Sequence, residues 1–325
     1  MKKKLLLIPT LSLTLVVASC GTPKPNVNNE IKNFILLGLD GLDYQTLQTK
    51  VMPLLNENAQ ENLVFDSKEF ETSVVDSGNA WRTVLYGSQY EVTDSNGNPK
   101  KSGEDIFSKV KAKYKDSKNA AFYNWFAMNP NSYTNNNNMT WGVLDRDVNN
   151  ALDDQFDADS ALKENEGYNL SSLSDKTSDN NPFKDKLKNL EEAQTYTDFI
   201  YENAMKENEN RSIKAIDQDF NFIFHYDTVW DDLHHGEFSY QTDNEIDDAV
   251  LDKIVEVYAK WINYYFSLDK DKWFVGVTTD HSRDEEDFNH TTDNAKKSWF
   301  ISNQDLGTKY KYNKLSSFRD IVLSK

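Results

Sequence analysis

The chain has 325 residues, with 36 Lys and Arg against 53 Asp and Glu, a formal net charge of −17 and a pI of about 4.7. This acidic balance disfavours a long nucleic acid as a partner, because phosphate backbones are bound by stripes of Lys and Arg. The length is enough for one large α/β domain or two smaller ones. The only cysteine is Cys20, so no disulfide can form within the chain.

The N-terminus has the pattern of a bacterial lipoprotein signal. Three lysines precede an apolar run, Leu5–Val17, that is too short for a stable membrane span. The run ends in Ala18-Ser19-Cys20-Gly21, which looks like a lipobox whose Cys receives a diacylglyceryl group. We therefore expect a signal peptide at 1–19, a lipidated N-terminus and linker at 20–30, and a globular domain at 31–325 anchored on the extracellular face of the cell membrane. An ordinary signal peptide with an incidental Cys is the alternative.

Continuous apolar runs predict strands that are buried on both faces. They lie at residues 33–39, 120–124, 220–226, 273–279 and 298–302. Helical patterns at 105–114, 187–206 and 245–266 separate these runs, which predicts a three-layer α/β/α sandwich with a mostly parallel central sheet. Residues from about 129 to 181 are rich in Asn, Ser and acidic residues and predict a polar insertion, either a lid or a disordered excursion.

Four of the 5 histidines stand near aspartates, in two groups. The groups are Asp227-Thr-Val-Trp-Asp231-Asp-Leu-His234-His235, and Asp280-His281 followed by His290. Carboxylate oxygen and imidazole nitrogen are the ligands that a divalent ion such as zinc prefers. Both groups, and Asp40, follow predicted strands, and ligands of open α/β sheets bind outside the carboxyl ends of the strands. The sequence therefore predicts a metal-dependent enzyme.

A candidate nucleophile begins the segment Ser77-Gly-Asn-Ala-Trp-Arg-Thr-Val-Leu-Tyr-Gly87, which has the pattern of a short helix. A serine at a helix start is most often an N-cap. The alternative is a nucleophile, because a helix N-terminus presents free N–H groups to an anion and a nearby metal lowers the pKa of a hydroxyl. With metal ligands predicted elsewhere in the chain, we favour the nucleophile for Ser77.

Taken together, these segments resemble the alkaline phosphatase superfamily, most closely its nucleotide pyrophosphatase/phosphodiesterase-like branch. The matching segments, in the order of the family and within residues 33–302, are Ile35–Gly41, Ser77–Gly87, Asp231 to His235, Thr279–His281 and His290. The resemblance implies an alkaline-phosphatase-like fold and two divalent ions, with Zn²⁺ the expected metal. It assigns Asp40, Ser77, Asp280 and His281 to one ion, and Asp231, His235 and His290 to the other.

The resemblance also implies a mechanism. Ser77 would attack phosphorus to give a phosphoseryl intermediate, which water on the second ion would hydrolyse. Asn79, or an amide of the turn at Gly78, would hold a phosphate oxygen. The family usually has Asp-x-x-Gly-His in the segment that ends at His235, and here His234 stands in place of the Gly. Asp231 with His235 keeps the spacing of the family, and Asp227 with His234 is a rival pair of ligands.

The expected function is a two-metal phosphohydrolase that acts on a small phosphodiester or nucleotide-like substrate outside the membrane. A sulfatase is disfavoured, because Asn79 and Trp81 stand where its signature needs Pro and Arg. Two alternatives remain. One is a catalytically degenerate binding lipoprotein, and the other is a phosphomonoesterase, which typically needs a well-placed arginine; Arg82 and Arg283 lie near the motifs.

Replacement of Cys20 by Ser should release the protein from the membrane, because two or three acyl chains are what make such attachment lasting. In detergent phase partitioning, we expect the wild type in the detergent phase and the Cys20→Ser variant in the aqueous phase. Unchanged retention of the variant in the detergent phase would contradict the lipid anchor.

Overall fold

The computed structural model of this chain describes residues 33–72, 74–87, 105–124, 128, 141–142, 205–206, 208–234, 248–283, 292–307 and 312–324. All of them belong to the unit Ile31–Lys325. The predicted signal peptide and linker, with Cys20, lie outside the described residues. Within the predicted polar insertion, the structure describes one short strand, Trp141–Gly142. None of the described helices is long and apolar enough to cross a membrane.

A seven-stranded sheet forms the centre, in the order β2-β9-β7-β1-β6-β4-β5. Its strands are β1 (Asn33–Leu39), β2 (Phe65–Asp66), β4 (Asn119–Phe122), β5 (Trp141–Gly142), β6 (Phe222–Asp227), β7 (Trp273–Thr278) and β9 (Phe300–Ser302). All pairs from β7 through β1 and β6 to β5 are parallel, whereas β9 is antiparallel to both of its neighbours. A separate antiparallel ribbon joins β3 (Phe70–Glu71) to β8 (Lys297–Ser298).

The burial of the central strands explains why the sequence shows them as continuous apolar runs. β1, β6 and β7 are buried along their whole lengths. A strand with helices on both faces of its sheet buries both sets of side chains, so its apolar residues follow one another without alternation. The five predicted strands correspond to β1, β4, β6, β7 and the segment of β8 and β9. β2 and β5 have only 2 residues each and carry too little pattern to be predicted.

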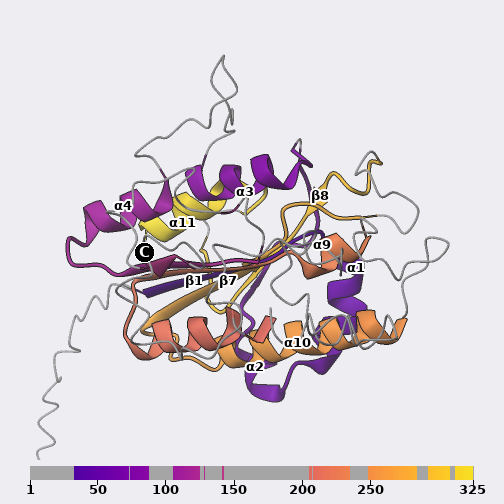
Figure 1. Ribbon diagram of the computed structural model, residues 1–325, viewed down its shortest axis with the longest axis horizontal. Coiled ribbons are helices and arrows are strands. Elements are labelled where there is room, and N and C mark those ends of the chain that lie inside the picture. Colours follow the sequence, from indigo (N-terminus) through magenta and orange to yellow (C-terminus); the bar gives the residue numbers. More distant parts are fainter. Residues whose placement is uncertain are drawn as a thin grey trace, which may run out of the picture. The chain divides into compact units, whose positions relative to one another are not determined.

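Helices cover both faces of the sheet (Figure 1). On one face α11 (Ser317–Ser324) contacts α3 (Ser77–Tyr86) and α4 (Ile106–Lys113), and on the other face α10 (Asp248–Phe266) contacts α2 (Glu57–Asn62). Among the other described elements are α1 (Tyr44–Thr46), a π-helical turn (Leu47–Val51), a 3₁₀ turn (Met52–Leu54) and α9 (Val229–His234), and residues 208–217 are also helical. The predicted α/β fold with a mostly parallel central sheet is therefore confirmed. The predicted helices at 105–114 and 245–266 are α4 and α10; of the one at 187–206, only 205–206 is described, and it is helical.

One histidine lies in the core, away from the acidic groups of the motifs. The imidazole of His225, in β6, is completely buried and shares a 2.6 Å hydrogen bond with the hydroxyl of Tyr265. Its ring centroid is 4.4 Å from that of Trp261. Burial lowers the pKa of His225 from 6.5 to about 3, so the folded protein keeps this side chain neutral at physiological pH.

The buried His225 should make the protein less stable in acid. Between the unfolded pKa of 6.5 and the folded pKa of about 3, the unfolded chain takes up a proton that the folded chain does not. Stability therefore falls as the pH falls through 6.5, by about 2 kcal/mol between pH 7 and pH 5 for this one group. Urea unfolding at both pH values should show this loss in the wild type relative to a His225→Gln variant. Equal losses in the two proteins would contradict the assignment.

Candidate active site

The carboxyl ends of three adjacent parallel strands supply the acidic side chains of the site. Asp40 directly follows β1, and Asp280 and His281 follow β7 after Thr279. Asp231 lies on α9, the short helix that follows β6. Because β6, β1 and β7 are neighbours in the sheet, residues far apart in the sequence meet at one edge. The edge predicted from the sequence is therefore where the structure places these side chains.

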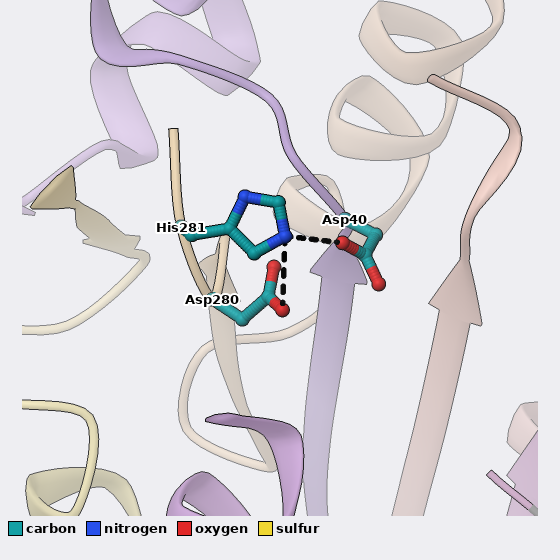
Figure 2. Close-up of side chains that lie close together, drawn as sticks. All are labelled: Asp40, Asp280 and His281. Carbon is teal, nitrogen blue, oxygen red and sulfur yellow. Dashed lines mark ion pairs between the residues drawn. The ribbon is translucent and has the colours of Figure 1, made fainter. Parts of the chain in front are cut away.

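Asp40, Asp280 and His281 form a compact, completely buried group (Figure 2). His281 Nε2 lies 3.3 Å from Asp40 Oδ1 and 3.6 Å from Asp280 Oδ2. One possible ligand atom from each of the three residues lies within 4.8 Å of the others. This is the arrangement that a bound cation with oxygen and nitrogen ligands requires.

Asp231 adds a third carboxylate beside this group. Its Oδ1 lies 3.8 Å from His281 Nε2 and accepts a 2.6 Å hydrogen bond from Nε of Arg283, whose side chain is buried. Gly41 allows this approach for two reasons. Its φ of +67° is disfavoured for other residues, and a Cβ at this position would lie 2.5 Å from Asp231 Oδ1.

The negative charges of the buried carboxylates favour a bound cation. Burial lowers the pKa of His281, but Asp280, the hydrogen bond with Asp40 and the Asp231 carboxylate outweigh burial and raise it to about 10. Burial, with Asp40 and Asp231, raises the pKa of Asp280 well above its ordinary value, although His281 opposes the shift. Buried carboxylates this close repel one another, and either a proton or a metal ion relieves the repulsion.

The oxygen and nitrogen donors of the group fit a divalent ion. His281 Nδ1 donates to the carbonyl of Ser282 at 3.1 Å, which leaves Nε2 as the atom that faces the carboxylates. Asp280 Oδ1 accepts a hydrogen bond from the backbone N–H of Gly41, whereas its Oδ2 has no hydrogen-bond donor among the described residues. A buried carboxylate oxygen without a donor lies next to the imidazole nitrogen that would bind an ion once its proton is lost, and such a pair is what a metal site offers.

Ser77 opens α3 beside this group, and it is not the helix cap. The N-cap is Asp76, whose side chain accepts the backbone N–H of Asn79 at 2.9 Å. The hydroxyl of Ser77 instead lies 3.3 Å from Asp40 Oδ1 and 3.1 Å from His281 Nε2. The capping role considered for Ser77 from the sequence is therefore wrong. Since the backbone N–H of Asn79 is engaged by the cap, a role of Asn79 in holding phosphate would fall to its side chain.

The rival pair, Asp227 with His234, makes other contacts. Asp227 Oδ1 accepts the hydroxyl of Tyr258 at 2.7 Å and the N–H of Val229 at 3.1 Å, and Oδ2 accepts the amide of Asn124 at 2.6 Å. His234 Nδ1 donates to the carbonyl of Trp230 within the same helix, at 2.7 Å. Of the two aspartates, Asp231 is the one that lies with His281. His235 and His290, predicted to join Asp231, lie outside the described residues.

Sequence reasoning missed two aromatic residues of the site. The indole N–H of Trp81, in α3, donates to Asp40 Oδ2 at 3.0 Å, and the hydroxyl of Tyr226, in β6, donates to the same oxygen. Both residue types are common in cores, so nothing in the sequence separates them from packing residues. The available signal was positional, because Tyr226 stands one residue before the end of a strand adjacent to β1.

No protein-family model matches the chain, and a comparison with curated proteins finds no match. Among solved structures, the alkaline phosphatase of the Antarctic bacterium TAB5 is 13% identical with a TM-score of 0.48, covering 90% of this chain and 98% of that one. The C-terminal periplasmic domain of the phosphoethanolamine transferase EptC from Campylobacter jejuni is 12% identical with a TM-score of 0.45, covering 90% of this chain and 88% of that one. A protein in the alkaline phosphatase superfamily from Vibrio parahaemolyticus is 12% identical with a TM-score of 0.42, covering 83% of this chain and 60% of that one. At these identities and scores, the likeness concerns the fold alone.

Removal of one ligand should abolish tight metal binding. We expect Asp280→Asn to weaken Zn²⁺ binding by more than about 100-fold, because the loss of an outer-shell partner alone costs about 10- to 100-fold. Asp227→Asn, which makes the same change at the buried aspartate of the rival pair, should bind Zn²⁺ like the wild type. Titration calorimetry on the metal-free proteins measures both; equal weakening would contradict the ligand assignment, and weakening by Asp227→Asn alone would favour the rival pair.

Proposed function

We propose that the protein is a divalent-metal-dependent hydrolase of phosphoric esters in which Ser77 is the nucleophile. One observation carries the proposal: the hydroxyl of Ser77 lies within 3.3 Å of Asp40 and 3.1 Å of His281, at the start of a helix whose cap is a different residue. A serine with no capping role that touches two candidate metal ligands is placed for chemistry on an anion.

In this proposal, the chain holds the ion through Asp40, Asp280 and His281. When bound, the ion would lower the pKa of the Ser77 hydroxyl and polarise the phosphoryl group. Ser77 Oγ attacks phosphorus, the bond from phosphorus to the leaving oxygen breaks, and the resulting phosphoseryl group is hydrolysed by water. The first N–H groups of α3, at Ser77 and Gly78, belong to a first turn without partners inside the helix, and in this proposal they would stabilise the negative charge that develops.

The finer proposal keeps what the sequence resemblance implies. The substrate is a small phosphodiester or nucleotide-like molecule, the metal is zinc, and acylated Cys20 holds the enzyme outside the membrane. A second ion on Asp231, His235 and His290 would stabilise the leaving oxygen. Among these three residues, the structure describes Asp231 alone, and Arg283 already donates to it at 2.6 Å. A second ion would therefore share Asp231 with a guanidinium group.

The contact of Arg283 supports a second candidate, a phosphomonoesterase. A monoester carries one more negative charge than a diester, and an arginine that reaches the metal site can offset it. Arg283 is buried against Asp231, which itself lies 3.8 Å from His281. Relative rates with bis-nitrophenyl phosphate and nitrophenyl phosphate, with and without zinc, separate the two candidates. Zinc binding without turnover of either substrate would favour the degenerate binding lipoprotein.

Removal of the Ser77 hydroxyl should stop turnover and leave the fold intact. We expect Ser77→Ala to lower turnover by about 10⁴-fold or more, because the attacking atom is lost. The free energy of unfolding should change by less than about 1 kcal/mol, since the cap at Asp76 is retained. Thr83→Ala is the matched control, since it removes a hydroxyl from the same helix, one that donates to the backbone carbonyl of Asn79 at 2.9 Å.

Initial rates and urea unfolding of both variants measure these effects. Ester hydrolysis by Ser77→Ala at the wild-type rate would contradict the covalent mechanism, even if the metal site is real. Ser77→Thr, which keeps the hydroxyl, should retain measurable activity.

A further inference from the structure

The two oxygens of the Asp40 carboxylate have different surroundings. Oδ1 faces the hydroxyl of Ser77 at 3.3 Å and His281 Nε2 at 3.3 Å. Oδ2 accepts two hydrogen bonds, one from the indole N–H of Trp81 at 3.0 Å and one from the hydroxyl of Tyr226. The oxygen that faces the proposed ion is thus distinct from the oxygen that the core holds.

The positions of the two donors, Trp81 and Tyr226, depend on close packing at Gly38. Gly38 and Tyr226 are register partners on β1 and β6, and Asp40 follows Gly38 by two residues. A Cβ at Gly38 would lie 2.5 Å from the ring of Trp81, so the missing side chain is what lets the indole rest on β1. The rings of Trp81 and Tyr226 then meet edge to face at 5.2 Å.

Both groups can act only as donors toward Asp40. An indole N–H has no acceptor capacity. A phenol hydroxyl carries its proton at physiological pH, and toward a carboxylate oxygen it is therefore the donor. Two donors on one oxygen of a buried carboxylate fix the orientation of the carboxylate.

We propose that Trp81 and Tyr226 are positioning residues that make Asp40 a one-oxygen metal ligand: they hold Oδ2 and thereby direct Oδ1 at the ion and Ser77. The inference rests on the proposed metal-dependent function and adds how the ligand is held. A purely structural role would affect folding stability without affecting metal affinity, and this difference makes the inference testable.

Tyr226→Phe tests the inference, with Tyr258→Phe as a matched control. Each variant removes one phenol hydroxyl that is completely buried and donates to an aspartate, Asp40 in one case and Asp227, at 2.7 Å, in the other. In calorimetric titration of the metal-free proteins with Zn²⁺, we expect Tyr226→Phe to raise the Kd about tenfold to 100-fold, the usual effect of losing an outer-shell partner. Tyr258→Phe should stay within about twofold of the wild type, although both metal-free variants should melt at lower temperature than the wild type.

Trp81→Phe removes the other donor and provides an independent second variant, which should also raise the Kd for Zn²⁺. A Kd within about twofold of the wild type for Tyr226→Phe, or equal increases in the two tyrosine variants, would overturn the inference while leaving the proposed function in place. Absence of Zn²⁺ binding by the wild type would instead overturn the proposed function and this inference with it.

Discussion

Three buried carboxylates, those of Asp40, Asp231 and Asp280, converge on the single imidazole of His281. Removing one charge from water costs several kcal/mol, and like charges at these distances add to that cost. Arg283 offsets the charge of Asp231, and the remaining negative charge raises the pKa of His281, which favours a proton on the imidazole when no ion is bound. A divalent ion would take the place of that proton and supply the charge that the group lacks.

The scaffold can carry this unfavourable group because its surroundings are rigid. β1 lies between β6 and β7 at the centre of the sheet, and all three strands are completely buried. Asp40, Asp280 and His281 lie in the turns that follow β1 and β7 within two or three residues, so the ends of buried strands position them. Binding of an ion to the folded state alone would return stability by mass action. In this account, the same repulsion that weakens the metal-free protein gives the site its affinity.

Much of the fold and part of the site could be predicted from the sequence. Strands buried on both faces give uninterrupted apolar runs, and Asp40, Asp280 and His281 stand directly after such runs. The role of Ser77 could not be settled in this way, because Asp76 and Ser77 are both good capping residues and only the structure shows which one caps. In the sequence, Trp81 and Tyr226 resemble ordinary core aromatics, and only the structure shows their hydrogen bonds to Asp40. His235, His290 and Cys20 stay predictions.

The central claim is that Asp40, Asp280 and His281 hold a divalent ion beside Ser77. Diffraction at the zinc absorption edge, from crystals of the protein grown with Zn²⁺, tests it most directly. We expect an anomalous peak about 2.0–2.2 Å from His281 Nε2 and from one oxygen each of Asp40 and Asp280. The hydroxyl of Ser77 should face the same peak. A zinc peak that lies away from these three residues, or a Ser77 hydroxyl turned away from the ion, would contradict the account.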